Sequence, residues 1–577
     1  MKTGAWLARY ALEQLPVSIT FGIPGVHTTE LYDELAKSER IQPVLVTHEG
    51  AGAFMADAVS RTVPGGIGVL VIVPAAGVAC AMSGIGEAFL DGIPLLVISG
   101  GPRTDMPQRF QLHEIDQQRL VESVTKATWK ITDHAAVVPT LFDAYRVAVS
   151  GCPGPVLVEI PVNIQLLRGE ADPLPVFDER VGRPSIDRPR LDQAAALLAA
   201  ARQPGLFVGW GAVDAVDDTV RIAELLGAPV STTLQGMSAF PGDHRLHTGM
   251  GFSPAAVPAA RNAFREVDCL LAVGTRFSEI PTGSFSAVVP ANLIHVDIDP
   301  AVFDKNYKAK VALEGDARDV LPALLDRLHA LGVNMPQRAE RVADRIAEDK
   351  EAFKAEWYAH HTERVNPAVF FDELRRQLED DAILVVDDGN HTYLAAEQYQ
   401  VRLPRTFVTP TDFNCMGYAV PAAIGAKLVR PDTQVVAVAG DGAFLMTGLE
   451  LITASTYQAG VVIFVFDDGE LSQIAQGQEI PYNRKVCSVL GQLEIEGVAQ
   501  ATGAALVTIE DDRAIATGMR SAFDIAATGR PVVVDVKIDY SKRTCFTSGV
   551  VKSVLKRFPP GDRVRFIARA LTRRVTG

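Results

Sequence analysis

Two acidic turns in the C-terminal third of the sequence carry residue types that could bind a metal ion and a phosphate group. Asp441 lies in a Gly-Asp-Gly turn at 440–442 after the apolar run VVAVA, and Asp468 follows the next apolar run, GVVIFVF. Parallel strands present their carboxyl ends at one edge of a sheet, where α/β proteins bind ligands. Gly440 and Gly442 let the backbone approach an anion, and the helix start that follows offers free N–H groups to a phosphate.

Carboxylate oxygens from Asp441 and Asp468 suit Mg²⁺, a hard cation that often shares its ligands with a bound diphosphate. The alternative is a plain strand-to-helix turn, which a single Gly-Asp-Gly would favour. The second acidic strand end, close behind the first in the sequence, favours the metal site.

The elements that must position these residues follow one pattern through most of the 577 residues. Apolar runs such as GVLVIV and PVVVDV alternate with helical segments, which predicts an α/β protein with doubly wound parallel sheets. A charged, Pro-rich stretch at about 166–189 and a highly charged helix at about 335–365 interrupt the pattern. We therefore expect three domains, at 1–165, 190–330 and 366–540, and a basic tail at 541–577.

The two acidic turns resemble the fingerprint of the thiamine diphosphate (ThDP) enzymes of the acetolactate synthase and pyruvate decarboxylase superfamily, in which Gly-Asp-Gly is followed by an Asn pair. The resemblance implies pyrimidine-binding, central and diphosphate-binding domains in that order. It also implies Mg²⁺ ligands from Asp441, Asp468 and the backbone carbonyl of Glu470. Asp467-Asp468 stands here in place of Asn-Asn. That departure keeps an oxygen ligand and adds one negative charge beside the diphosphate.

The N-terminal segment VLVTHEGAGAFMADAVSR resembles the catalytic glutamate segment of the same superfamily. The resemblance makes Glu49 the residue that hydrogen-bonds N1′ of the aminopyrimidine ring. That contact favours the imino form of the cofactor, which removes the proton from C2 of its thiazolium ring. Without this context, a lone glutamate at a strand end is more often a helix cap or a member of a surface ion pair.

Further cofactor contacts follow from the same resemblance. FNCMGYAVPAAIGAKL resembles the segment whose large apolar residue supports the bent cofactor, which here is Met416, with a plain core methionine as the alternative. DDGNHTYLAAEQY lies where the family binds the diphosphate, with helix capping as the alternative role of its polar residues. The expected cofactor-binding residues are Gly389, Asn390, His391, Met416, Gly440, Asp441, Gly442, Asp468 and Glu470.

The segment RFQLHEIDQQ matches a loop that lines the substrate side of the site in relatives. His113 and Glu114 in this loop could transfer protons, because titratable pairs in clefts often do so. A solvated loop without a catalytic role is the alternative. Together with Glu49, these two residues complete the expected catalytic set.

The sequence departs from typical acetolactate synthases at two places in the expected substrate pocket. The loop at 74–80 reads PAAGVAC where the synthases carry Gly-Pro-Gly with an Asn three residues on, and Gly477 stands where they carry a tryptophan. Loss of the large ring should enlarge the pocket unless another loop fills it. The first expectation is decarboxylation of a 2-oxo acid and addition of the resulting enamine to a second carbonyl, as in a transferase or lyase of acetolactate synthase type.

Two alternatives remain open at this point. One is a decarboxylase that releases an aldehyde from a larger 2-oxo acid, and the other is an inactive, ThDP-binding regulatory subunit. The segment GTRFSEIPTG at 274–283 is similar to the FAD-binding version of the central domain, so FAD is a further candidate cofactor. The family builds its sites between subunits, which implies a homodimer or homotetramer.

Composition excludes several other classes of function. With 55 basic and 69 acidic residues the chain carries a net charge of −14, which disfavours nucleic acid as a partner. Its 6 cysteines form no CxxC pair, which argues against a zinc site and a disulfide framework. We see no targeting segment or membrane span and expect a cytoplasmic protein. The basic tail could lie on an anionic membrane, although packing over the acidic body is the favoured interpretation.

Overall fold

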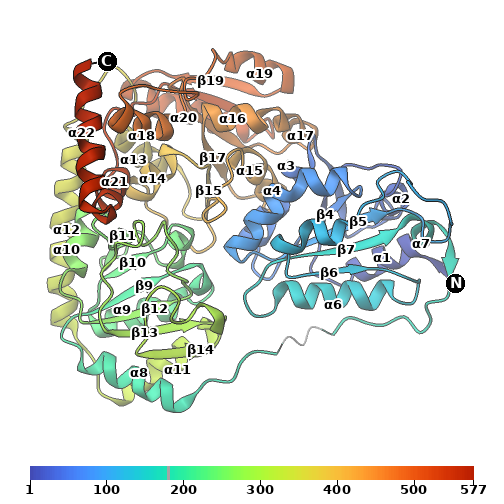
Figure 1. The fold of residues 1–577 in the computed structure, drawn as a ribbon, viewed down its shortest axis with the longest axis horizontal. Coiled ribbons are helices and arrows are strands. Elements are labelled where there is room, and N and C mark those ends of the chain that lie inside the picture. The colour runs from blue at the N-terminus through green and yellow to red at the C-terminus, as the bar shows by residue number, and fades with distance from the viewer. Residues whose placement is uncertain (179–181, 577) are drawn as a thin grey trace.

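The computed structural model describes residues 1–178 and 182–576. It contains three six-stranded sheets, and every neighbouring pair of strands within them is parallel. The predicted α/β class with three doubly wound sheets is therefore confirmed. Figure 1 shows the N-terminal domain (blue to cyan) beside the C-terminal domain (orange), with the central domain (green) below the latter.

The N-terminal sheet has the strand order β3-β2-β4-β5-β7-β6. Its inner strands are apolar throughout and buried on both faces, because helices cover both sides. The strands are β2 (Ile19–Gly22), β3 (Gln42–Leu45), β4 (Gly68–Ile72), β5 (Leu95–Gly101), β6 (Ala127–Lys130) and β7 (Pro155–Pro161). The main helices are α1 (Gly4–Leu12), α2 (Thr29–Leu35), α3 (Glu49–Thr62), α4 (Ala76–Asp91) and α6 (Val137–Val149).

The central sheet has the order β11-β10-β9-β12-β13-β14, with its own apolar core. Its strands are β9 (Pro204–Val208), β10 (Val230–Thr232), β11 (His247–Met250), β12 (Cys269–Val273), β13 (Asn292–Asp297) and β14 (Val311–Glu314). Its helices are α8 (Arg188–Ala200), α9 (Val216–Leu226), α10 (Pro258–Phe264) and α11 (Ala317–Ala330). The long α12 (Pro336–Tyr358) packs along α9 and α10 and reaches α13 (Pro367–Gln377) of the next domain.

The C-terminal sheet has the order β16-β15-β17-β18-β20-β19. Its strands are β15 (Ile383–Val386), β16 (Phe407–Val408), β17 (Val435–Gly440), β18 (Val462–Phe466), β19 (Ala505–Ile509) and β20 (Val532–Val536). Its further helices are α14 (Asn390–Gln398), α15 (Ala419–Val429), α16 (Asp441–Thr447), α17 (Leu451–Thr456), α18 (Ser472–Tyr482), α19 (Ile495–Thr502) and α20 (Ile515–Ala526).

The tail forms two helices, α21 (Cys545–Arg557) and α22 (Pro560–Thr576). α22 packs on α18, where the guanidinium groups of Arg569 and Arg573 stack over the ring of Tyr482. The tail thus packs on the body of the protein, as the favoured interpretation expected. Among the described residues, no helix has both the length and the apolar character that crossing a membrane would require.

A buried charge network joins the N- and C-terminal domains. Nε of Arg61 on α3 donates to Asp57 at 2.7 Å, and its Nη2 donates to Asp91 on α4 at 2.9 Å. The hydroxyl of Tyr418, next to α15, donates to Asp57 as well. Because a buried carboxylate or guanidinium is costly when it loses its partner, this network fixes how α3 and α15 meet. It therefore also fixes the start of α3, where Glu49 lies.

Candidate functional site

The two acidic turns lie together at the carboxyl ends of β17 and β18. The Asp441 carboxylate, almost fully buried, accepts hydrogen bonds from the backbone N–H groups of Gly469 at 2.7 Å and Asp468 at 3.3 Å. The Asp468 carboxylate accepts a bond from the Ser472 hydroxyl, while its Oδ1 is buried without a partner. Burial raises the pKa of Asp441 to about 7, with the charge of Asp468 adding to the effect. A buried carboxylate beside a half-buried one suits a divalent cation.

The extra acidic residue Asp467 is paired with a lysine that the motif did not reveal. Its carboxylate contacts Nζ of Lys537, which also lies 2.9 Å from the carboxylate of Asp535. Lys537 follows β20, the strand hydrogen-bonded to β18, so the sheet brings the two residues side by side. Lys537 therefore balances part of the negative charge, since it is shared by Asp467 and Asp535. The expected additional charge beside the diphosphate stays a prediction.

The side chain of Glu470 is occupied elsewhere. Its carboxylate lies 2.6 Å from Nζ of Lys485, and its backbone pairs with Val489 in an isolated antiparallel bridge. The side chain is thus held by an ion pair, so the metal contact expected from this residue rests on its backbone carbonyl. That contact stays a prediction.

The loop after β15 places further polar atoms at the same edge of the sheet. The His391 ring lies so close to Gly440 that a Cβ there would come within 3.1 Å of its Cε1 atom. Burial lowers the pKa of His391 to about 3, so the ring is neutral at physiological pH. Three buried atoms here have no partner: Nε2 of His391, Oδ1 of Asn390 and Oδ1 of Asp388.

Unpartnered buried polar atoms are rare in folded proteins, so a cluster of them is a suitable place for a polar ligand or an ion to bind. Asn390 and His391 are not needed as helix caps, because Gly389 is the N-cap residue of α14 and the Thr392 hydroxyl accepts its N–H bond at 3.0 Å. The alternative role considered for them is therefore filled by other residues.

Met416 lies in a turn that a buried carboxylate holds. Asp387 accepts hydrogen bonds from the N–H groups of Gly417 at 2.8 Å and Ala419 at 2.7 Å. Burial raises the pKa of Asp387 to about 7. The half-buried Met416 side chain is fixed at the start of α15 by these two bonds. Its contact with a cofactor stays a prediction.

Glu49 is the first residue of α3 and half-buried. His48 is the N-cap residue of this helix, and its Nδ1 accepts the N–H of Gly50 at 3.0 Å. A Cβ on Gly77, in the first turn of α4, would lie 3.3 Å from Oε1 of Glu49. Glycine at 77 therefore leaves the carboxylate room at the edge of the sheet, where a ring nitrogen of a ligand could reach it.

Sequence reasoning missed the residue that holds the backbone before Glu49. Glu450, which precedes α17 and is almost fully buried, accepts bonds from the N–H of Thr47 at 3.0 Å, from the Thr47 hydroxyl and from the Thr453 hydroxyl at 2.7 Å. The C-terminal domain thus positions a catalytic segment of the N-terminal domain. No sequence motif signals this contact, because the two residues lie 403 positions apart.

His113 is brought to a second histidine that the sequence did not single out. The rings of His27 and His113 lie 5.2 Å apart at the carboxyl ends of β2 and β5, and Nδ1 of each is buried without a partner. Burial and the neighbouring His113 lower the pKa of His27. Glu114 differs, since it is exposed and its carboxylate accepts the N–H of Gln111 at 2.8 Å within the loop.

The central domain borders a cavity of about 260 Å³ at the carboxyl ends of its strands. Three arginines in its lining are all committed to ion pairs: Arg276 with Asp412, Arg318 with Asp316 and Arg405 with Asp214. At this volume the cavity lies just below the ~300–1,000 Å³ that is usual for ligand cavities. FAD binding by the central domain stays a prediction.

Comparison with known protein families assigns all three domains. Residues 1–120 match the thiamine pyrophosphate enzyme N-terminal TPP-binding domain, residues 191–324 the central domain, and residues 387–536 the C-terminal TPP-binding domain. These matches together span most of the chain and include Glu49, Asp441 and Asp468.

Curated relatives resemble the chain along nearly its whole length. It is 32% identical to the acetolactate synthase large subunit of Corynebacterium glutamicum, over 92% of this chain and 86% of the relative. It is 31% identical to the probable acetolactate synthase large subunit of Methanocaldococcus jannaschii, over 97% and 94%. It is also 31% identical to the acetolactate synthase isozyme 3 large subunit of Escherichia coli, over 94% and 96%.

Proposed function

Because this chain belongs to the family of thiamine pyrophosphate enzymes that includes the acetolactate synthase large subunits, we propose that it decarboxylates a 2-oxo acid and joins the remaining fragment to a second carbonyl compound. The observation that carries the proposal is the arrangement at the carboxyl ends of β15, β17 and β18. There Asp441, Asp468, Asn390 and His391 combine two carboxylates, one of them buried, with buried polar atoms that have no partner. This donor set fits Mg²⁺ and a diphosphate.

The C-terminal domain would bind the diphosphate end of the cofactor. Asp441 and Asp468 would supply carboxylate oxygens to Mg²⁺, with the backbone carbonyl of Glu470 as third protein ligand. The backbone at Gly440 and Gly442 and the N-terminus of α16 would approach the phosphate oxygens. Lys537 limits the local negative charge by pairing with Asp467.

Glu49 would contact the aminopyrimidine end of the cofactor. ThDP, when bound, supplies the electron sink that makes loss of carbon dioxide from a 2-oxo acid feasible. Glu49 would hold a proton at N1′ of the aminopyrimidine ring, which requires its carboxyl group to stay within hydrogen-bond distance of that atom. The contact of Thr47 with Glu450 keeps the backbone before Glu49 in place.

The His27–His113 pair is the second candidate for proton transfer. Both rings present an unpartnered Nδ1 at the sheet edge that carries Glu49. A neutral histidine beside the reacting carbonyl can donate a proton to the developing alkoxide or hydrogen-bond the substrate carboxylate. Glu114, exposed and bonded within its loop, would act on His113 only indirectly.

A homodimer fits the exposed surface of the C-terminal domain. Large apolar side chains are exposed on α16, on α17, on the turn between them and at the end of β3: Leu45, Leu445, Met446, Leu449 and Ile452. Exposed apolar side chains gathered on neighbouring elements suit a protein–protein interface. We place a second copy of the chain there, so that each site uses Glu49 of one subunit and Asp441 of the other.

Activity assays over a panel of 2-oxo acids test both the reaction and the size of the substrate pocket. An added Cβ on Gly477 would meet no atom within 4 Å, so this position leaves open space where a larger residue would project a side chain. We expect pyruvate to be consumed with ThDP and Mg²⁺ and an acyloin acid to form. Aldehyde from a bulky 2-oxo acid, without carboligation, would instead identify a simple decarboxylase.

The Glu49→Gln variant tests the mechanism. We expect turnover to fall by ~10²–10⁴-fold, the usual contribution of a proton-transfer group, while ThDP still binds. Glu39→Gln, an exposed position in the same domain, is the matched control and should leave turnover unchanged. Unchanged turnover of the Glu49 variant would reject the assignment, and loss of ThDP binding alone would reject the proton-transfer role.

A further inference from the structure

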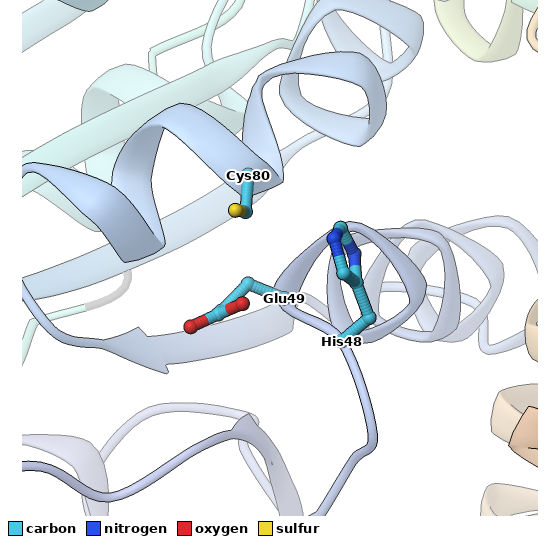
Figure 2. Close-up of side chains that lie close together, drawn as sticks. All are labelled: His48, Glu49 and Cys80. Carbon is cyan, nitrogen blue, oxygen red and sulfur yellow. The ribbon is translucent and has the colours of Figure 1, made fainter.

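Three potential metal ligands meet at the start of α3. His48 and Glu49 lie at its N-terminus, Cys80 lies in the first turns of α4, and their ligand atoms all lie within 4.8 Å of one another. Figure 2 shows Cys80 above Glu49, with the His48 ring beside them. His48 and Cys80 are exposed and Glu49 is half-buried, so an ion can reach the group from solvent.

We propose that His48, Glu49 and Cys80 form an inhibitory site for a thiophilic divalent cation, with Zn²⁺ as the best fit. The binding itself depends only on these three side chains. The inhibitory consequence rests on the proposed function, because it assumes that the aminopyrimidine ring of ThDP lies against the Glu49 carboxylate and so takes the space of the metal. A metal that takes the Glu49 carboxylate and ThDP would then exclude each other.

The donor set selects the metal. A thiolate, an imidazole and a carboxylate together suit Zn²⁺, whereas Mg²⁺ and Ca²⁺ prefer oxygen ligands alone. Tetrahedral zinc, with bonds of about 2.0–2.3 Å, needs its ligand atoms closer together than in the present arrangement. The distances between the ligand atoms must therefore shorten by roughly an ångström. Cys80 and His48 can move by this amount because both are exposed. A water molecule would supply the fourth ligand.

The site should bind reversibly rather than as a structural zinc centre. Nδ1 of His48 accepts the N–H of Gly50 at 3.0 Å, so a metal bound through this nitrogen competes with the cap of α3. Burial and the neighbouring Glu49 charge raise the pKa of the Cys80 thiol, so the metal must displace a proton from sulfur. Zinc affinity should consequently increase with pH.

Cobalt spectroscopy on the full-length, ThDP-free protein tests binding directly. Co²⁺ bound to a thiolate gives a sulfur-to-metal charge-transfer band in the near ultraviolet, whereas Co²⁺ held only by the carboxylates of Asp441 and Asp468 does not. We expect this band in the wild-type protein, its loss in Cys80→Ser and a roughly tenfold weaker Co²⁺ affinity in His48→Asn, since asparagine can still cap the helix. Cys487→Ser removes another exposed thiol and should keep the band.

Competition experiments test the consequence. Zn²⁺ at saturating Mg²⁺ should raise the apparent dissociation constant for ThDP by tenfold or more in the wild type and in Cys487→Ser, and chelation should reverse the effect. In Cys80→Ser the shift should be less than threefold relative to that variant without zinc.

A charge-transfer band that survives in Cys80→Ser, or that disappears in Cys487→Ser, would overturn the site. A band that depends on Cys80 without any effect of zinc on ThDP affinity would overturn the inhibitory role. Failure of the proposed function is separate from both, because it would leave the cobalt band unchanged and abolish only the reaction with 2-oxo acids.

Discussion

The contact between Glu450 and Thr47 gives the sharpest test of how the fold positions Glu49. The almost fully buried Glu450 carboxylate accepts the Thr47 N–H, the Thr47 hydroxyl and the Thr453 hydroxyl. Glu450→Gln keeps the size of the side chain and one acceptor oxygen. Its amide group, however, points a donor at a second donor, so one charge-assisted hydrogen bond is lost.

The magnitude follows from that single bond. A hydrogen bond to a charged group contributes ~1.5–3 kcal/mol, which corresponds to about a 10- to 150-fold change in a local opening equilibrium. Hydrogen exchange of the peptide that contains Thr47 should therefore accelerate by one to two orders of magnitude in Glu450→Gln. Because Thr47 lies two residues before Glu49, turnover should fall about tenfold while the global fold is kept.

A double-mutant cycle with Thr47→Val separates this contact from general destabilisation. Residues in direct contact show coupling energies of about 0.5–3 kcal/mol, so the double variant should lose less than the two single variants together. Glu496→Gln, an exposed glutamate on α19, is the control and should leave exchange and turnover unchanged. Normal exchange at Thr47 together with normal turnover in Glu450→Gln would refute the idea that the C-terminal domain positions Glu49.

Three further predictions follow from particular contacts. Ala75 precedes α4 with φ 57° and ψ −88°, a conformation that costs a non-glycine residue ~1–3 kcal/mol. Ala75→Gly removes this strain but makes the unfolded chain more flexible, so the free energy of unfolding should rise by only about 1 kcal/mol. A lower melting temperature would contradict this. Burial lowers the pKa of His247 to about 3, below its ordinary value near 6.5. Between these two values the unfolded chain binds a proton at His247 and the folded chain does not. The free energy of unfolding should therefore fall as pH drops from about 6 towards 4. His247→Asn should reduce that slope by up to ~1.4 kcal/mol per pH unit in denaturant titrations, and an unchanged slope would rule out His247 as its source. Lys537→Met leaves the Asp467 charge unpaired. Calorimetric titration at saturating Mg²⁺ should then show ThDP affinity weakened by about three- to tenfold, and by less at high salt. Equal affinity would mean that the Asp467 charge does not act on the diphosphate.

The α/β class and the family could both be predicted from the sequence, because each depends on local information. Alternating apolar strands and helices carry their period in consecutive residues, and the parallel sheets follow from that pattern. The Gly-Asp-Gly turn and the following acidic strand end carry their chemistry in a short segment. The sequence therefore placed Asp441 and Asp468 at neighbouring strand ends, where the structure has them.

The pairings that set the charge and geometry of the site depend on the tertiary structure alone. Lys537 reaches Asp467, and Glu450 reaches Thr47, across domains or strands far apart in the chain. The sequence separation of such pairs follows no rule, because any two loops at the same edge of a sheet can come into contact. Sequence patterns therefore cannot predict these contacts.

The cysteines show the same limit. The absence of a CxxC pair says nothing about residues far apart in the chain, and the fold brings Cys80 on α4 close to His48 and Glu49 at the start of α3. Sequence determines which residue types and elements exist. The packing of parallel strands decides which of their carboxyl ends, and therefore which side chains, face one another.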